Sequence, residues 1–394
     1  MKKLLALSLA IIILITSIPT ASALGLLIPM KGDADGSGTI TANDARLILR
    51  TAVGLYTPFI LRRYLFDTNS DGKISADDAR LTLRVAVGLE SFTNSTASRE
   101  QNIKSFTENV SEKELSTLMN EICALGSRSV IYPKNNLAAQ EYISQKLRDY
   151  GVNFKKQTFT YAGLETANII ATLEKKNENS NILLLCTHFD NYDGNAGAID
   201  NASGLAALLH IVKLIKENNI TFNCEVRLAF LSAEEMGYYG AYRYISALSD
   251  DEISRMSVFN IDMAGNSKLG GGRILTVSTE PVTDSYPHRT AKSNTVSNAI
   301  EKAKNLLGNL GEESFMSPVS AGRHDIVAFR KSGIPSVTLS WREIRSAGAY
   351  GSDYNLSSPS QIHTSLDTLE NFNMTSLYNT TRLILASLLL DFTA

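Results

Sequence analysis

The segment ILLLCTHFDNYDGNAGAIDNASG, residues 182–204, changes from continuous apolar residues to polar ones within a few positions. The run from Ile182 to Cys186 has the length and composition of a strand buried on both faces of a sheet. His188 follows it almost directly, although the chain has only five histidines in 394 residues. A surface loop would account for the glycines and asparagines that come next, but it would not need an imidazole at the end of a buried strand.

The surrounding chain alternates between predicted strands and predicted helices. The predicted strands are ILLLC, CEVRLAFLS, SVFNI and PSVTLSW, which begin at residues 182, 224, 257 and 335. The predicted helices cover residues 136–150, 205–216 and 239–248, and a long helix follows residue 364. Continuous apolar strands separated by helices predict an α/β domain whose mostly parallel sheet is flanked by helices.

Acidic residues follow two more of these strands, as His188 follows the first. Glu234 and Glu235 come after the second strand, and Asp262 comes after the third. Each motif alone could be a solvated loop, and the two glutamates could simply be acids at a helix start, where the helix dipole favours them. In open α/β sheets, however, the carboxyl ends of the strands share the edge at which ligands bind. The agreement of all three motifs therefore favours one common site.

Imidazole and carboxylates that converge at one sheet edge are ligands typical of zinc. Asp200 stands beyond a glycine-rich stretch and just before a predicted helix, so it can fold back beside His188 and bridge two metals. Asp190, two residues after His188, can orient that imidazole by a hydrogen bond. The sequence thus predicts a zinc site with more than one metal.

Five stretches carry a resemblance to the co-catalytic di-zinc aminopeptidases of metallopeptidase family 28. They are HFD, GAIDNASG, SAEEMGYYGA, NIDMAG and IHTSLDT, and the resemblance spans about residues 115–394. It implies a fold of the zinc exopeptidase type, a peptide substrate and two zinc ions. It also implies the following roles: His188 and Asp262 hold one zinc, Glu235 and His363 hold the other, Asp200 bridges them, and Glu234 is the general base.

One stretch departs from that family. Many relatives carry Ser-Asp-His shortly before a phenylalanine, whereas this chain has His324-Asp325-Ile326 before Phe329. These positions usually shape the cleft, so the preferred substrate stays open, and His324 is a candidate cleft residue. His210, in a predicted helix, and His288, in a loop with a proline, are not expected to be ligands.

Other functions remain to be weighed against an aminopeptidase. Glutaminyl cyclases share the fold and usually bind a single zinc, but DNASG and EEMGYYGA favour a peptidase. A non-catalytic binding module on the same fold is disfavoured because all five ligand positions and the base are intact. Carboxypeptidase action is left open, because it uses the same metal core.

A second pattern lies nearer the amino terminus, where a segment repeats after 34 residues. DADGSGTITANDARLILRTAVGL begins at Asp33, and DTNSDGKISADDARLTLRVAVGL begins at Asp67. Each has the spacing of a calcium loop, in which alternate residues supply oxygen ligands and a glycine (Gly38 or Gly72) permits the sharp turn. The predicted ligands are Asp33, Asp35, Ser37, Thr39 and Asp44 in the first loop, and Asp67, Asn69, Asp71, Lys73 and Asp78 in the second. Thr39 and Lys73 would bind through their backbone carbonyls.

The paired loop-then-helix pattern resembles the dockerin module of cellulosomal enzymes over about residues 30–90. This resemblance implies a small all-α domain, two calcium ions and docking onto the cohesin module of a scaffold protein. In that family, loop positions ten and eleven help to choose the partner, and here they are Ala42-Asn43 and Ala76-Asp77. A free calcium sensor or a structural stalk is the alternative.

The first residues are typical of an export signal, with Lys2 and Lys3 before an apolar run and Ala21-Ser22-Ala23 as a cleavage site. An N-terminal anchor is the alternative, but the apolar part is short for a membrane span. A formal charge of −2 gives no reason to expect nucleic acid or an anionic membrane as partner. Three cysteines are too few for a disulfide framework and are expected to pack as small apolar residues.

These features predict four segments in a secreted protein that is associated with a scaffold or a cell surface. They are a signal peptide at 1–23, a dockerin-like calcium-binding domain at 30–90, a polar linker at 91–110 and a zinc peptidase domain at 111–394. No contact with a membrane is expected once the signal peptide has been removed.

Overall fold

The structure of the chain is a computed structural model, and it has two compact units, one ending at Asn102 and one beginning at Ile103. The residues it describes are 31–37, 39–56, 65–69, 73–90, 95–270, 273–278, 290–308, 316–319, 324–347 and 354–393. The predicted signal peptide, His288 and, in the calcium loops, Gly38, Asp71 and Gly72 lie outside these ranges.

In the small unit, each predicted calcium loop is followed by a helix of eleven residues. The helices are α2 (Ala42–Ala52) and α3 (Ala76–Ala86). Each begins with a capping box, formed by Thr41 with Asp44 and by Ser75 with Asp78, which satisfies backbone N–H groups at the helix start. Among the described residues of this unit, the buried core contains Ala34, Ile48, Leu65, Phe66 and Ala79.

Helix α4 (Ser95–Phe106) occupies much of the predicted linker and is followed by a short 3-10 turn at Thr107–Asn109. The boundary between the two units falls inside it. Its sequence is polar and has no apolar stripe, so hydrophobic periodicity gave no signal for a helix there.

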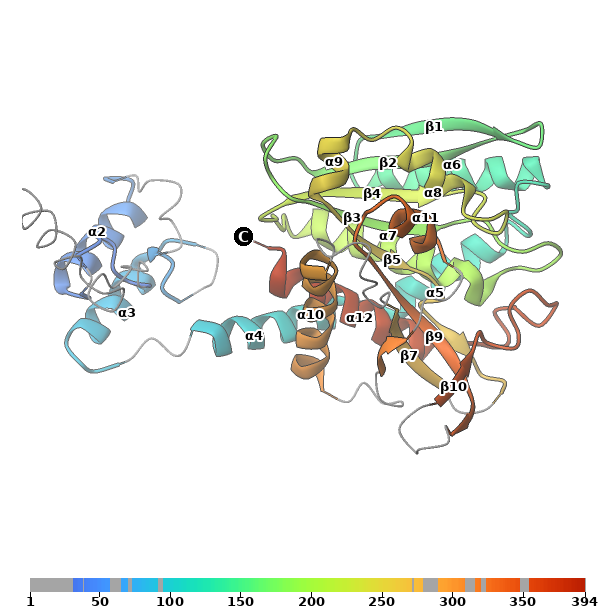
Figure 1. The fold of residues 1–394 in the computed structure, drawn as a ribbon. Coiled ribbons are helices and arrows are strands. Elements are labelled where there is room, and N and C mark those ends of the chain that lie inside the picture. Colours follow the sequence, from blue (N-terminus) through green and yellow to red (C-terminus); the bar gives the residue numbers. More distant parts are fainter. Residues whose placement is uncertain are drawn as a thin grey trace, which may run out of the picture. The chain divides into compact units, whose positions relative to one another are not determined.

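The large unit is built on one nine-stranded sheet with the order β1-β2-β4-β3-β5-β9-β7-β8, and β10 pairs with β9 (Figure 1). The strands are β1 (Phe154–Tyr161), β2 (Leu164–Glu174), β3 (Ile182–His188), β4 (Glu225–Leu231), β5 (Met256–Ile261), β7 (Arg273–Ser278), β8 (Met316–Val319), β9 (Ser336–Ala347) and β10 (Tyr354–Ser357). The short strands β6 (Asn266–Ser267) and β11 (Phe372–Asn373) form a separate pair.

The sheet is mixed, which corrects the expectation of a mostly parallel one. The four strands predicted from the sequence, β4, β3, β5 and β9, are parallel neighbours in the centre. Outside them, β1 with β2, β2 with β4, and β7 and β10 with β9 are antiparallel. The first reversal is a two-residue hairpin in which Ala162 and Gly163 have φ of 48° and 84°. Turns of this kind favour Asn-Gly or Asp-Gly, so Ala-Gly was a weak sequence signal.

Helices cover both faces of the sheet (Figure 1). One face carries α5 (Glu112–Cys123), α6 (Pro133–Asp149), α7 (Ser203–Glu217), α10 (Thr290–Leu307) and α12 (Met374–Asp391), and the other carries α8 (Tyr239–Ile245), α9 (Asp250–Arg255) and α11 (Ile326–Lys331). Strand β3 is apolar on both of its faces, so helices are needed on both sides of the sheet. Leu183 and Leu185 pack into the hydrophobic core on one side, and Leu184 and Cys186 pack into the core on the other. All three cysteines are buried and unpaired.

Strand β3 lies where the strand order reverses, because β4 flanks it on one side and β5 on the other. Helix α7 connects β3 to β4, and with the preceding turn it forms an apolar stretch, Ala198–Glu217, that is long enough to cross a membrane. That stretch is 94% buried inside the protein, as expected for a core helix. The reversal leaves a crevice outside the carboxyl ends of β3 and its neighbours, which is where open α/β sheets bind ligands.

The closing helix begins later than the sequence suggested. It was expected soon after Thr364, but α12 starts at Met374, after several turns and strand β11. Asn373 caps it by accepting hydrogen bonds from the backbone of Thr375 and Ser376.

The close packing of α8 against the end of β4 depends on Gly240. A Cβ atom at this position would lie 2.1 Å from the backbone oxygen of Ser232 and 2.7 Å from Oδ1 of Asn168. We expect Gly240→Ala to lower the free energy of unfolding by about 1–3 kcal/mol, as overpacking does. Chemical denaturation measures this, with Ser246→Ala at the exposed end of the same helix as control. Equal stability of the two variants would contradict the steric argument.

Candidate metal centre and active site

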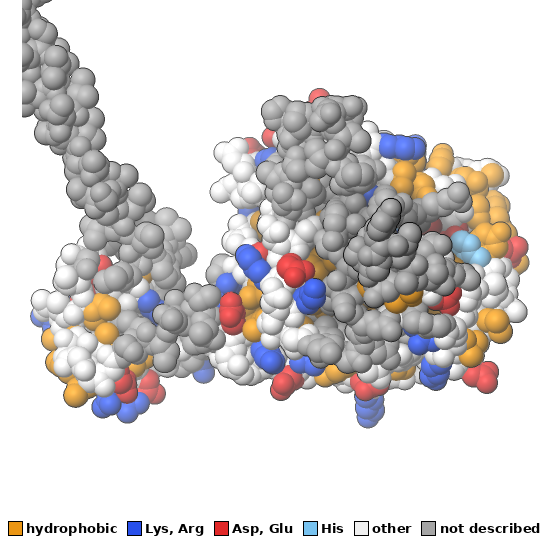
Figure 2. Space-filling view, turned by 60° about the horizontal axis from the view of Figure 1, so that its bottom comes forward, with side chains coloured by type: hydrophobic (Ala, Val, Ile, Leu, Met, Phe, Trp, Pro, Cys, Tyr) orange, Lys and Arg blue, Asp and Glu red, His pale blue; other side chains and the backbone are white. Residues whose placement is uncertain are grey.

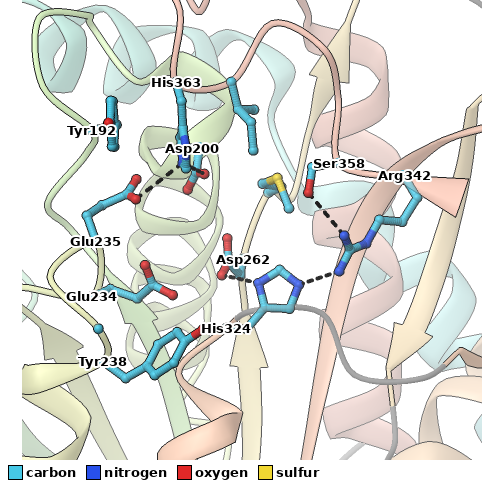
Figure 3. A pocket seen from close by; sticks show the side chains of 13 residues that line it. Tyr192, Asp200, Glu234, Glu235, Tyr238, Asp262, His324, Arg342, Ser358 and His363 are labelled. Atoms are coloured by element: carbon cyan, nitrogen blue, oxygen red, sulfur yellow. Dashed lines mark hydrogen bonds and ion pairs between the residues drawn. The ribbon is translucent and has the colours of Figure 1, made fainter.

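A cavity of about 730 Å³ opens at the carboxyl ends of β3, β4 and β5 (Figure 3). Its walls include Asp200, Glu234, Glu235, Asp262 and His363, which the sequence singled out. His188 ends β3 and is 1% exposed. The structure therefore gathers the predicted zinc ligands and the predicted base at the edge where the strand order reverses.

The first ligand group consists of His188, Asp200 and Asp262. Nε2 of His188 lies 3.2 Å from Oδ1 of Asp200 and 3.5 Å from Oδ1 of Asp262. All three side chains are buried, and their nearest ligand atoms lie within 4.8 Å of one another. Such a set is compact enough to surround one metal ion.

The second ligand group consists of Asp200, Glu235 and His363. Nε2 of His363 lies 3.4 Å from Oδ2 of Asp200 and 3.2 Å from Oε2 of Glu235. The His363 ring stacks on Tyr192, with ring centroids 4.4 Å apart and planes 12° apart. Because the two oxygens of Asp200 face different groups, the geometry suits a carboxylate that bridges two metals.

Unpartnered atoms test whether a metal fits here. Nε2 of His188, Oδ1 of Asp200, Oε1 of Glu235 and Oδ1 of Asp262 are buried and have no hydrogen-bond partner. Leaving such atoms unsatisfied costs about 1–3 kcal/mol each. One imidazole nitrogen and three carboxylate oxygens are a donor set that zinc accepts, so the residues present fit the metal that the sequence implied.

The shifted pKa values of the buried site residues also favour a bound metal ion. Burial raises the pKa of Glu235 to about 7, and the nearby charge of Asp200 adds to the rise. Burial also raises the pKa of Glu234 well above its ordinary value, against the opposing effect of His188. Burial lowers the pKa of His188, but Asp262 and Glu234 outweigh it and hold that pKa well above the usual range. Carboxylates crowded in this way favour a bound cation.

Asp190 connects the two strand ends. Its backbone oxygen lies 3.1 Å from Nδ1 of His188, whereas its carboxylate lies 3.6 Å from that atom. The carboxylate instead accepts hydrogen bonds from the backbone N–H groups of Glu234, at 3.1 Å, and Glu235, at 3.3 Å. Asp190 thus fixes the start of the Glu-Glu segment relative to His188, and its backbone oxygen, not its carboxylate, is the hydrogen-bond partner of the imidazole.

Arg128 holds the loop between two of the ligands and was not predicted. Its guanidinium is fully buried and donates to the backbone oxygens of Phe189, at 2.8 Å, and Ala196, at 2.7 Å. A third bond, at 3.2 Å, reaches the backbone oxygen of Gly197, whose φ is 55°. A Cβ at Gly197 would lie 2.5 Å from Cβ of Asn191, so only glycine fits beside this arginine.

Asp367 positions the backbone at Asp200 and was not predicted either. Its carboxylate accepts hydrogen bonds from the backbone N–H groups of Ile199, at 2.6 Å, and Asp200, at 3.3 Å. Burial raises the pKa of Asp367 to about 7. The residue stands four positions after His363 in IHTSLDT, so that quoted motif contained it, but nothing in the spacing assigned it a partner.

His324 lies in the cleft and supports Asp262. Its Nδ1 lies 2.6 Å from Oδ2 of Asp262, and Nη2 of Arg342 lies 2.8 Å from its Nε2 (Figure 3). An arginine can only donate, so Nε2 accepts and the proton sits on Nδ1. The second oxygen of Asp262 is thereby occupied, and Oδ1 stays directed toward His188.

His210, which was not expected to be a ligand, lies outside the two ligand groups. It lies on α7, where its Nε2 accepts a hydrogen bond from the backbone of Ser111, and burial lowers its pKa to about 4.

The sequence matches the family model described as Peptidase family M28 over residues 168–388, more than half of the chain. It is 27% identical over 246 residues to leupeptin-inactivating enzyme 1 of Streptomyces exfoliatus, covering 61% of this chain and 52% of that protein. It is 30% identical over 176 residues to aminopeptidase YwaD of Bacillus subtilis, covering 44% of this chain and 35% of that protein. The chain thus spans about half or less of the length of these curated relatives.

The fold is similar to that of Porphyromonas gingivalis glutaminyl cyclase, with a TM-score of 0.54 and 21% sequence identity over 71% of this chain and 97% of that one. At this identity the likeness concerns the fold alone.

We expect Arg128→Met to destabilise the large unit, because it removes the donor to three backbone oxygens, two in buried hydrogen bonds and one in a part-buried hydrogen bond. The free energy of unfolding should fall by about 3 kcal/mol or more. Arg148→Met removes the same charge from the exposed side of α6 and should change it by less than about 1 kcal/mol. Urea denaturation of both variants provides the comparison, and a difference of less than about 1 kcal/mol between them would count against the role of Arg128.

Proposed function

The chain belongs to peptidase family M28, and from this membership we propose that it is a di-zinc exopeptidase, an aminopeptidase that removes amino-terminal residues from peptides. The observation that carries the proposal is the pair of ligand groups that share Asp200, next to Glu234, in a cavity at the sheet edge. The names of the curated relatives include an aminopeptidase and an enzyme that inactivates leupeptin, which agrees with peptide bonds as substrate.

In this proposal, zinc ions held by the two groups would activate water and polarise the scissile carbonyl. His188 and Asp262 would hold one ion, Glu235 and His363 the other, and Asp200 would contact both. Asp190, Asp367 and His324 keep these side chains in place through the hydrogen bonds described above. The protein's part is to fix the ligands before substrate arrives, so that little reorganisation is needed during the reaction.

Glu234 is the proposed general base. It lines the cavity but belongs to neither ligand group, and its side chain is only 7% exposed. Its carboxylate would take a proton from water as the water oxygen bonds to the scissile carbonyl carbon. It would then give that proton to the leaving nitrogen as the carbon–nitrogen bond breaks. Burial raises the pKa of the Glu234 carboxyl, and a carboxyl with a raised pKa is suited to such transfers.

A glutaminyl cyclase is the second candidate, because the fold is shared with one. The presence of two complete ligand groups favours the peptidase. Metal counting on the purified protein separates the two, since the peptidase should hold two zinc ions per chain and a cyclase one.

For the small unit we propose a calcium-binding, dockerin-like module that docks onto a cohesin module. The carboxylates of Asp33, Asp35 and Asp44 lie within 4.8 Å of one another, as a calcium loop requires. In the second loop, Asp67, Asn69, Lys73 and Asp78 are described, while Asp71 lies outside the described residues. The loops would hold one calcium ion each.

The docking proposal is supported by a duplicated apolar surface. Three hydrophobic pairs separated by 34 residues are equally exposed: Leu49 and Leu83 at 44% and 45%, Val53 and Val87 at 61% each, Leu55 and Leu89 at 68% each. Figure 2 shows such orange side chains on the surface of the small unit. Exposed apolar groups of this size mark protein-binding sites, and their duplication would let either helix face the partner.

We further propose that the chain is exported, with residues 1–23 as its signal peptide, and that it works outside the cell on a scaffold. The support is the composition of that segment together with the dockerin-like repeat, because scaffold docking of this type is extracellular in the family that the repeat resembles.

Glu234 and Glu235 are adjacent, so exchanging each for glutamine tests their roles with matched changes. We expect Glu234→Gln to retain two zinc ions and to lower kcat by about 10²–10⁴-fold, because glutamine cannot accept the proton. Glu235→Gln should lose zinc as well as activity, because it removes a charged ligand. Zinc content and hydrolysis of an unblocked peptide are measured on both variants, with the amino-acetylated peptide as a control that an aminopeptidase should not cleave. Zinc loss from Glu234→Gln alone would show that the roles are reversed.

Asp77 and Asp78 offer a similar pair for calcium. Asp78 is buried and accepts hydrogen bonds from the backbones of Thr68 and Ser75, whereas the exposed Asp77 pairs with Arg80. Calcium should raise the helical circular dichroism of chelator-treated protein, because metal binding and folding are coupled. Asp78→Asn should weaken that response about tenfold or more in calcium concentration, and Asp77→Asn should leave it unchanged. A small unit that is fully folded in chelator would overturn the expectation.

A further inference from the structure

We propose that Arg342 anchors the substrate's free α-carboxylate, one residue beyond the scissile bond, so that dipeptides are preferred substrates. The inference rests on the proposed peptidase function and adds a substrate class to it. No role for Arg342 was predicted from the sequence, and the residue belongs to neither ligand group.

Arg342 is a buried cation whose guanidinium has N–H groups not used in hydrogen bonds to the described residues. Its side chain lines the cavity and is 8% exposed. Nη1 donates to Oγ of Ser358 at 3.2 Å, and Nη2 donates to Nε2 of His324 at 2.8 Å. Ser358 and the accepting nitrogen of His324 carry no negative charge. Among the described residues, no carboxylate forms an ion pair with Arg342. A guanidinium has five N–H donors, so three remain in a place where an unpaired charge is costly.

The cavity is polarised along its length. In Figure 3, Glu234 and Glu235 lie at one side, Arg342 and Ser358 lie at the other, and Asp262 lies between them. A dipeptide with free ends carries an ammonium group at one end and a carboxylate at the other, about two residues apart. The charge of the cavity therefore complements a zwitterion better than it complements a long peptide or a blocked one. A volume of about 730 Å³ suits a ligand of that size.

The spacing can bring the carboxylate of the residue directly after the scissile bond to Arg342. The imidazole of His324 lies between Asp262, a proposed zinc ligand, and the guanidinium of Arg342. Its hydrogen bonds to them measure 2.6 Å and 2.8 Å. The scissile carbonyl must lie at the proposed metals. The α-carboxylate of the next residue follows about 3.5 Å further along an extended chain, and a charge-assisted hydrogen bond adds about 2.8 Å.

A purely structural role is the alternative, in which Arg342 only fixes the tautomer of His324. That role would affect every substrate equally, because Asp262 is used in all turnovers. An anchor for the α-carboxylate would instead distinguish substrates that differ only at that group. The ratio of two kcat/KM values isolates the second role from the first.

The test uses the full zinc-loaded chain with Leu-Gly, Leu-Gly amide and Leu-Asp amide. We expect the wild type to prefer Leu-Gly over its amide, and Arg342→Met to reduce that preference about 10- to 100-fold, mainly through KM, as loss of hydrogen bonds to a charged group does. Arg342→Lys should keep part of the preference, because it keeps the charge but not the planar fork. Arg148→Met, which removes an exposed arginine from α6, should keep all of it.

A binding measurement complements the kinetics. Calorimetric titration of Leu-Gly into zinc-loaded Glu234→Gln protein should show an affinity that falls by a similar factor when Arg342→Met is added. If Arg342→Met does not fold, the same comparison with Arg342→Lys decides.

The outcomes separate this inference from the function on which it rests. Hydrolysis of Leu-Gly and its amide at a ratio that Arg342→Met and Arg342→Lys leave unchanged would overturn the anchor and leave the peptidase standing. A preference for Leu-Asp amide over Leu-Gly would assign Arg342 to an acidic side chain and overturn the α-carboxylate. No hydrolysis of any peptide by the zinc-loaded wild type would overturn the proposed function itself.

Discussion

The large unit depends on holding three carboxylates together in a buried place where they repel one another. Asp200 is the centre of this constraint, because its two oxygens face different histidines, His188 at 3.2 Å and His363 at 3.4 Å. These histidines are far apart in the sequence, one at the end of β3 and one in the turns before α12. A sheet edge at a reversal of strand order brings such distant segments together, so the topology supplies the position and the neighbouring hydrogen bonds supply the orientation.

The supporting hydrogen bonds go mostly to the backbone rather than to the ligand side chains. Arg128 donates to backbone oxygens of the loop after His188, and Asp367 and Asp190 accept from backbone N–H groups next to Asp200 and Glu235. Fixing the backbone leaves the ligand atoms free, which explains why those atoms are buried without partners. Arg128 also places a positive charge near Asp190 and Asp200. The framework therefore offsets part of the repulsion among the carboxylates without occupying the oxygens that face the site.

The sequence predicted the central strands and the residues that end them, because a buried strand followed at once by an acid or a histidine is a local pattern. His363 was predicted only through the resemblance to a family, since it stands in a turn and does not directly follow a strand. Arg128 and Arg342 could not be found in this way, because their partners are a distant loop and a distant histidine. The antiparallel flanks were missed for another reason: β1 is partly exposed and its turn is Ala162-Gly163, so both strand and hairpin signals were weak.

In both units, a single aspartate uses its two carboxylate oxygens to contact two different parts of the structure. In the small unit, Oδ1 of Asp44 accepts from the backbone of Asp35 in the loop, and Oδ2 accepts from the backbone of Thr41 at the start of α2. The carboxylate thus serves the loop and the helix at once, as Asp200 serves two ligand groups. A cation bound in the loop would draw on the same carboxylate that caps the helix, so loop order and helix formation would rise together. With a core of five buried apolar side chains among the described residues of this unit, such coupling is a source from which it could gain stability.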